Sequence, residues 1–213
     1  MLIIPGAIYL EYIYNTDKLP GEGQICIAKD AAVIPRGKAI SQSLAAARWE
    51  VRTALVGRIG NDVLSQQVIT RIRRQGIMTS GVVGAEDLTG MAVSIVDEEG
   101  RYSSINFMGA NAEVSEDQVP EEILGPGNIL LAQMELEPSL ILELLEKAKA
   151  GGATTMLNLS PGPVIGAEVY DYADYIIARP ESAHHFAELC GIQDAADDYK
   201  LAGAISDAGD LTC

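Results

Sequence analysis

Short apolar segments suited to buried strands alternate along the chain with longer segments suited to helices. The expected strands are 2–13, 53–57, 129–133, 154–157 and 175–178, and the expected helices are 41–49, 62–75 and 138–150. The 62–75 segment carries apolar residues at the spacing of one helix face, and Gly76 predicts its end. Strands joined by helical crossovers form parallel sheets covered on both faces. The sequence therefore predicts an α/β fold with a mostly parallel sheet flanked by helices.

Two further pairs of segments break this alternation. Segments 91–96 and 102–108 flank a polar run of the length found in hairpin turns. Segments 24–27 and 31–34 also have the composition of short strands separated by polar residues. We expect these four segments to form a small antiparallel sheet that stands apart from the main sheet, within a single domain covering 1–213.

The charge of the chain limits its partners. It carries 30 acidic and 15 basic residues, which give a net charge of −15 at pH 7. This charge repels phosphate backbones and anionic lipids, so neither nucleic acid nor a membrane surface is an expected partner. No segment approaches the roughly 20 apolar residues of a membrane-spanning helix, and the first residues lack the basic region of a signal peptide. Three cysteines without metal-ligand spacing favour reduced thiols and a cytoplasmic location.

Eight short motifs occur in a recognisable order over roughly the first 190 residues. They are GAIYLEY (6–12), LPGEG (19–23), RGKAISQSLAAAR (36–48), ALVGRIGND (54–62), TGMAVSIVDEEGRYS (89–103), GANAEVS (109–115), QMELE (133–137) and LNLSPGP (157–163). In this order they resemble the ribokinase-type carbohydrate kinases, the phosphofructokinase B superfamily. The resemblance implies a ribokinase-like core with a small β lid formed by segments at about 14–36 and 90–109. In many family members the lid also supplies a dimer contact.

The family binds its sugar between lid and sheet, and the matching positions imply six substrate-binding residues in this chain. They are Glu11, Gly37, Lys38, Ser41, Glu135 and Asn158. Tyr9 and Glu11 replace the usual asparagine and aspartate of the first motif. Arg36 and Ala39 replace two glycines where a sugar hydroxyl approaches the start of a helix. We therefore expect a pocket that is narrower or differently charged than the usual one.

Several of these positions also have an ordinary structural explanation. Arg36 and Lys38 suit a solvated helix start. Glu135 suits a surface carboxylate beside the N-terminus of the following helix, and Asn158 suits a turn. If a small ligand binds, we expect a neutral polyol, such as a sugar or nucleoside, because two carboxylates in one pocket repel a charged sugar, although Arg36 and Lys38 partly offset that repulsion.

The positions implied in phosphoryl transfer match the family less well. The family's Asn-Glu-x-Glu run, which organises magnesium, aligns with Arg179-Pro180-Glu181-Ser182 and leaves Glu181 as the one nearby carboxylate. The family's Gly-Ala-Gly-Asp motif has its one counterpart in segment 207–210, without the preceding strands or a following helix. We therefore expect no catalytic residue, metal or cofactor. Only if the chain is an active kinase would Asp210 act in catalysis and Glu181 bind metal, with magnesium and ATP as cofactors.

Two functions remain open. The first is a non-catalytic ribokinase-like protein that retains at most a sugar- or nucleoside-binding half-site or a role in an oligomer. The second is an active ATP-dependent sugar kinase with an alcohol group as acceptor. The changes at Tyr9, Arg36 and Arg179 and the lack of the family's nucleotide-binding half favour the first. An unpaired sheet edge and the apolar lid hairpin also predict a homodimer or higher oligomer.

Overall fold

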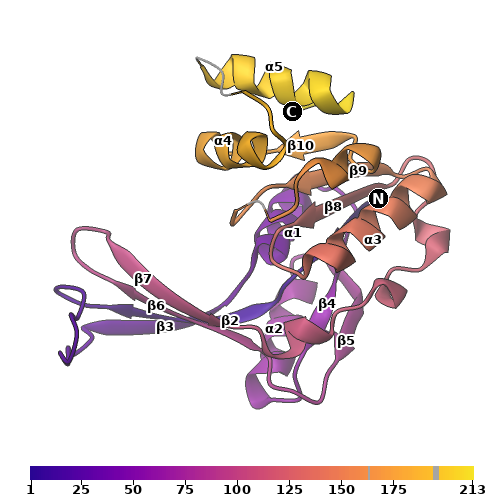
Figure 1. Cartoon of the computed structure of the whole chain (residues 1–213). Coiled ribbons are helices and arrows are strands. Elements are labelled where there is room, and N and C mark those ends of the chain that lie inside the picture. The colour runs from indigo at the N-terminus through magenta and orange to yellow at the C-terminus, as the bar shows by residue number, and fades with distance from the viewer. Residues whose placement is uncertain (163, 194–196) are drawn as a thin grey trace.

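The computed structural model describes residues 1–162, 164–193 and 197–213, so Pro163 at the end of the last motif lies outside the described residues. The chain forms a six-stranded sheet and a four-stranded sheet that projects from it (Figure 1). The main sheet has the order β10-β9-β8-β1-β4-β5, and every neighbouring pair is parallel. Its strands are β1 (Leu2–Pro5), β4 (Thr53–Ile59), β5 (Met78–Gly84), β8 (Ile129–Gln133), β9 (Thr154–Asn158) and β10 (Tyr175–Ile177). The predicted α/β class is confirmed.

Helices cover both faces of the main sheet. They are α1 (Lys38–Arg48), α2 (Val63–Arg73), α3 (Pro138–Gly151), α4 (Pro180–Leu189) and α5 (Asp198–Gly209), with short 3₁₀ turns at Gly109–Glu113, Glu116–Gln118, Glu121–Ile123 and Ala167–Asp171. Successive residues of a strand point to opposite faces. Ile3 therefore packs in the core that contains residues of α3, α4 and α5. Its neighbour Ile4 packs in the core that contains residues of α1 and α2.

The small sheet has the order β3-β2-β6-β7. Its strands are β2 (Tyr9–Asn15), β3 (Asp30–Arg36), β6 (Gly90–Val96) and β7 (Tyr102–Phe107). β6 and β7 form the predicted antiparallel hairpin, and β3 pairs antiparallel with β2. β2 and β6, however, pair in parallel, because both strands run outward from the main sheet (Figure 1). The small sheet is therefore mixed, and the expectation of a purely antiparallel sheet is wrong.

Three expectations about strands also differ from the structure. The apolar run 2–13 is split between β1 and β2, which lie in different sheets. The break falls at Gly6, where a Cβ would lie 2.6 Å from the Cβ of Ala39. Segment 24–27 is not a strand: β3 and β6 occupy both edges of β2, and Ile25 and Ile27 are almost fully exposed. β5 was not predicted, because its two glycines lower its strand propensity.

The predicted helices are confirmed with shifted ends. α1 begins three residues earlier than its alanine-rich part, at Lys38. On α3 the fully buried residue of the first turn is Ile141, and Gly152 ends the helix in the left-handed conformation. None of the helices in the described part of the chain has the length and hydropathy needed to cross a bilayer.

Asp62 caps α2 and also holds the loop before β6. Its Oδ1 accepts hydrogen bonds from the backbone N–H groups of Leu64 (3.1 Å) and Ser65 (2.9 Å). Its Oδ2 accepts from the backbone N–H of Thr89 at 3.0 Å and from the Thr89 hydroxyl. Burial acts to raise the pKa of the Asp62 carboxyl, but these hydrogen bonds outweigh it and hold the pKa below its usual value.

We expect Asp62→Ala to lower the free energy of unfolding by about 1–2 kcal/mol at neutral pH, since a helix cap is lost. The folded-state pKa is depressed, so the ionised carboxylate stabilises the fold above its unfolded pKa of about 4. That contribution disappears as the pH falls through the lower folded value. Urea denaturation at several pH values measures the difference in the free energy of unfolding between the wild type and Asp62→Ala. This difference should approach zero in acid.

Asp171→Ala is the matched control, because Asp171 is exposed and the described residues include no hydrogen-bond partner of its side chain. Equal losses for both variants, or a gap that stays constant down to acid pH, would contradict the cap assignment.

Candidate functional site

A cavity of about 510 Å³ lies between the small sheet and the carboxyl end of the main sheet. We call it the lid pocket. Its walls are one face of β2, β3, β6 and β7, the residues Gly37, Lys38 and Ser41 at the start of α1, and Glu135 and Pro161 beyond the ends of β8 and β9. Ligands in open α/β sheets collect at this end of the strands.

The register of the small sheet assigns each side chain to one of its two faces. Directly paired residues, and residues two apart along a strand, share a face. One face therefore carries the polar residues that line the lid pocket, which are Glu11, Arg36, Ser94, Ser104 and Asn106. The other face carries apolar residues, which include Val33, Val93, Ile95, Ile105 and Phe107. We call this second face the outer lid face.

Glu11 is held within the lid by two neighbours. Its Oε2 accepts a hydrogen bond from Nε of Arg36 at 2.5 Å, and its Oε1 accepts from Oγ of Ser94 at 2.6 Å. Glu11 is 9% exposed, whereas the Arg36 side chain is 54% exposed. Both carboxylate oxygens of Glu11 thus have partners, and the charge of Arg36 offsets the negative charge on this wall.

Glu135 lies against the first turn of α1, not against the helix that follows it in sequence. Its Oε2 accepts a hydrogen bond from the backbone N–H of Lys38 at 2.7 Å. Gly37 precedes that amide with a φ of 128°, and a Cβ there would lie 2.2 Å from the carbonyl oxygen of Ala7. Burial raises the pKa of the Glu135 carboxyl, although the hydrogen bond and the charge of Lys38 oppose the shift.

Tyr9 forms the buried end of the pocket beside Glu135. Its hydroxyl donates to Sδ of Met108 at 3.0 Å. Burial, together with the nearby charge of Glu135, raises the pKa of Tyr9 to about 12, so the ring carries a neutral hydroxyl at physiological pH. The residue that replaces the family's asparagine therefore supplies an aromatic wall.

Five of the six residues proposed from the sequence line this one cavity, namely Glu11, Gly37, Lys38, Ser41 and Glu135. Asn158 does not line it. It lies at the end of β9, and its backbone oxygen accepts a hydrogen bond from the N–H of Ser160 at 2.8 Å. Sequence reasoning missed Ser94, Ser104 and Asn106. Their two-residue spacing in and across the hairpin was the available signal.

Asp210 lies at the other end of the main sheet. It follows α5 with φ 48° and ψ 45° and lines a separate cavity together with Thr154 and Tyr175, which begin β9 and β10. The lid pocket lies beyond the opposite ends of the strands. The end of α5 beside Asp210 also presents carbonyl groups, which do not attract a phosphoryl group.

Glu181 is exposed in the first turn of α4, and Arg179 is the N-cap residue just before the helix. Within 1–162, 164–193 and 197–213, no group of three histidine, cysteine or acidic residues is arranged to hold a metal ion. Glu181 therefore belongs to no such group of three among the described residues.

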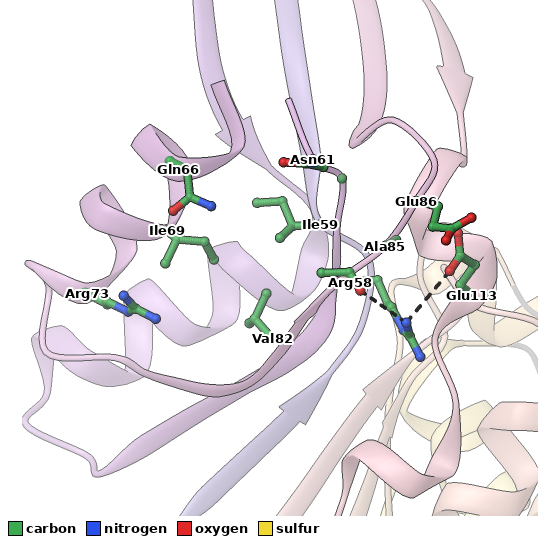
Figure 2. A pocket seen from close by; sticks show the side chains of 12 residues that line it. Arg58, Ile59, Asn61, Gln66, Ile69, Arg73, Val82, Ala85, Glu86 and Glu113 are labelled. Carbon is green, nitrogen blue, oxygen red and sulfur yellow. Dashed lines mark hydrogen bonds and ion pairs between the residues drawn. The ribbon is translucent and has the colours of Figure 1, made fainter. Parts of the chain in front are cut away.

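A second cavity of about 500 Å³ lies beside α2 and was not predicted (Figure 2). Gln66 and Arg73 of α2 lie on one side, and Arg58, Glu86 and Glu113 lie on the other (Figure 2). Its arginines already have protein partners. Arg58 donates to Gln118 Oε1 at 3.1 Å and to the carbonyl oxygen of Gly84 at 3.3 Å. Arg73 donates through Nε to Thr79 Oγ1 at 2.7 Å.

Known proteins resemble this chain in sequence. The ribokinase of Lactococcus lactis subsp. lactis is 23% identical over 198 residues, which cover 91% of this chain. The ribokinase of Mus musculus is 25% identical over 163 residues, which cover 75% of this chain. The chain spans 65% of the length of the first relative and 50% of the second.

Solved structures share the fold. A ribokinase from Thermotoga maritima has a TM-score of 0.86 and 25% identity, covering 98% of this chain and 68% of that protein. An Arabidopsis thaliana ribokinase, solved with ribose and ATP, has a TM-score of 0.80 and 23% identity, covering 99% and 69%. The model of the family described as pfkB family carbohydrate kinase matches residues 2–209. The chain therefore belongs to the pfkB family of carbohydrate kinases.

Proposed function

We propose that this chain binds a sugar or nucleoside in the lid pocket and does not itself transfer phosphate. The observation that carries the proposal is the convergence of five family-matched positions on one cavity that is lined by both polar and apolar side chains. The relatives named ribokinase support a sugar as ligand. We also propose a cytoplasmic location, which the three free cysteines support.

The pocket offers both donors and acceptors to a polyol. The Lys38 ammonium and the Ser41 hydroxyl lie at the start of α1, where they can donate to sugar oxygens. Glu135 uses Oε2 to bind Lys38, which leaves Oε1 to accept from a hydroxyl. Ser104 and Asn106 extend this polar wall along the lid. Such mixed donors and acceptors suit a ligand with several hydroxyl groups.

The absence of phosphotransfer is proposed from the positions of the two family-matched acids. A base must reach the hydroxyl that it deprotonates, but Asp210 lies beyond the wrong end of the strands for the lid pocket. Glu181 is exposed and belongs to no group of three potential metal ligands among the described residues. We therefore propose that this chain uses neither magnesium nor ATP as a cofactor. The family match favours the competing function, an ATP-dependent sugar kinase.

We expect Glu135→Ala to weaken sugar or nucleoside binding by about 10- to 100-fold, because one charge-assisted hydrogen bond is lost. Isothermal titration with ribose, deoxyribose and adenosine measures the affinity. Glu137→Ala is the matched control, since Glu137 lies two residues away, is exposed and does not line the lid pocket. Thermal melting of each variant separates lost binding from lost folding. Unchanged affinity in Glu135→Ala would show that the pocket is assigned wrongly.

We expect no measurable ATP binding and no ADP release when the chain is mixed with ribose, magnesium and ATP. We expect no ADP release because Asp210 and Glu181 do not line the lid pocket. We expect no ATP binding because Arg179 puts a positive charge where the family's asparagine helps to organise magnesium. Titration with ATP and a coupled assay for ADP provide the two measurements. Sugar-dependent ADP release that disappears in Asp210→Asn would establish the competing kinase function.

We further propose that the outer lid face joins two copies of the chain. Ile105 and Phe107 on β7 are 77% and 46% exposed, and Val33 and Val93 on neighbouring strands are also partly exposed. A contiguous apolar face of this kind usually marks a protein interface. The family resemblance supports the same surface, because the lid supplies a dimer contact in many members.

We expect the chain to be a homodimer in solution and Ile105→Glu to convert it to a monomer, because a charge in an apolar contact is poorly solvated. Light scattering after size-exclusion chromatography measures the mass. Val63→Glu is the control, since Val63 is also exposed and lies on α2, away from the lid. A wild-type monomer at micromolar concentrations, or a dimer that survives Ile105→Glu, would rule out this interface.

A further inference from the structure

Arg36 brings an incompletely used cation to the wall of the lid pocket. Its Nε donates to Glu11, but Nη1 and Nη2 have no protein partner among the described residues. Lys38 lines the same pocket, and its ammonium group has no hydrogen-bond or salt-bridge partner among the described residues, although its charge acts on Glu135. The two side chains are separated in sequence by Gly37 alone, at the turn from β3 into α1. The pocket therefore contains cationic hydrogen-bond donors that are available to a ligand.

The carboxylates of the pocket are less available than the cations. Glu11 has both oxygens bound, by Arg36 and Ser94. Glu135 has one oxygen bound to the Lys38 amide and is partly buried. The expectation of a neutral ligand treated both residues as free acceptors that would repel an anion. In the structure that repulsion is largely offset, because Glu11 already forms an ion pair.

We propose that the preferred ligand of the lid pocket is a sugar acid, whose carboxylate binds between Arg36 and Lys38. This inference rests on the proposed function and narrows it. A guanidinium group bound through Nε still presents Nη1 and Nη2 to a planar carboxylate, which matches their fork with two hydrogen bonds. Lys38 contributes a compact positive charge from the other side of Gly37.

The charge balance favours a carboxylate over a phosphate. Glu11 and Glu135 together balance Arg36 and Lys38, so the charged groups of the pocket sum to zero. A carboxylate adds one negative charge, whereas a phosphate monoester adds nearly two at neutral pH. The additional charge would increase repulsion from the two glutamates at short range. The hydroxyl groups of the acid would face Ser41, Ser104 and Asn106.

Isothermal titration of the 213-residue chain with ribonate, ribose and ribose 5-phosphate tests the proposal. We expect ribonate to bind at least about tenfold more tightly than ribose, the gain of one good charged contact. Arg36→Gln and Lys38→Gln should each reduce the ratio of ribonate to ribose affinity several-fold. Added salt should weaken ribonate binding more than ribose binding, because the contact is ionic.

Arg52→Gln is the control for the change of charge, since Arg52 is exposed and lies outside the pocket. It should leave the ratio unchanged. If Arg36→Gln does not fold, Lys38→Gln still tests the proposal, because it retains the backbone amide that binds Glu135. Thermal melting establishes that each variant is folded.

The outcomes separate this inference from the proposed function. Ribose binding as tight as ribonate, or a preference that both pocket variants retain, would overturn the sugar-acid proposal and leave sugar binding intact. Tighter binding of ribose 5-phosphate that depends on Arg36 would also overturn it, since the anion would then be a phosphate. If none of the three compounds binds, the proposed function fails and the sugar-acid proposal fails with it.

Discussion

The hydrogen bond from the backbone N–H of Lys38 to Glu135 joins the lid to the main sheet. Glu135 follows β8, and Lys38 begins α1 directly after β3 of the lid. The contact is possible because Gly37 has no side chain and passes close to the carbonyl oxygen of Ala7. The pocket therefore depends on a carboxylate that satisfies a helix end which has no cap of its own.

A second polar contact holds the lid from its other side. Asn111 lies in a 3₁₀ turn soon after the hairpin, and its side chain is bound to the backbone of Ile8, between β1 and β2. Asn111 Oδ1 accepts from the Ile8 N–H at 2.8 Å, while its Nδ2 donates to the Ile8 carbonyl oxygen at 3.0 Å. Both bonds are buried, where an unpaired amide would be costly. The start of β2 and the end of the hairpin are thus fixed together.

Fold prediction succeeded where the pattern is local and failed where pairing is distant. The helices and most strands of the main sheet follow from apolar spacing and from glycine stops. Segment 24–27 has strand composition, but β3 pairs with β2 and not with this segment. β5 has weak strand composition but forms a strand because it pairs with β4. Propensity cannot decide such cases, because the partner strand supplies the hydrogen bonds.

The candidate site was also predictable in part. Motif order brought Glu11, Lys38 and Glu135 into one proposed pocket, and the structure places all three along its walls. Motif order could not reveal that Glu11 is paired with Arg36 or that Asn158 does not line the pocket. Those facts depend on side-chain direction across paired strands, which a one-residue change of register would reverse.

The sequence by itself determined the α/β class, the main helices and the family, because these follow from local periodicity and from the order of short motifs. The tertiary structure alone decided which charges remain available in the pocket and at which end of the sheet Asp210 lies. Both outcomes depend on contacts between segments far apart in the chain, whose geometry is set only when the strands are paired and the helices packed.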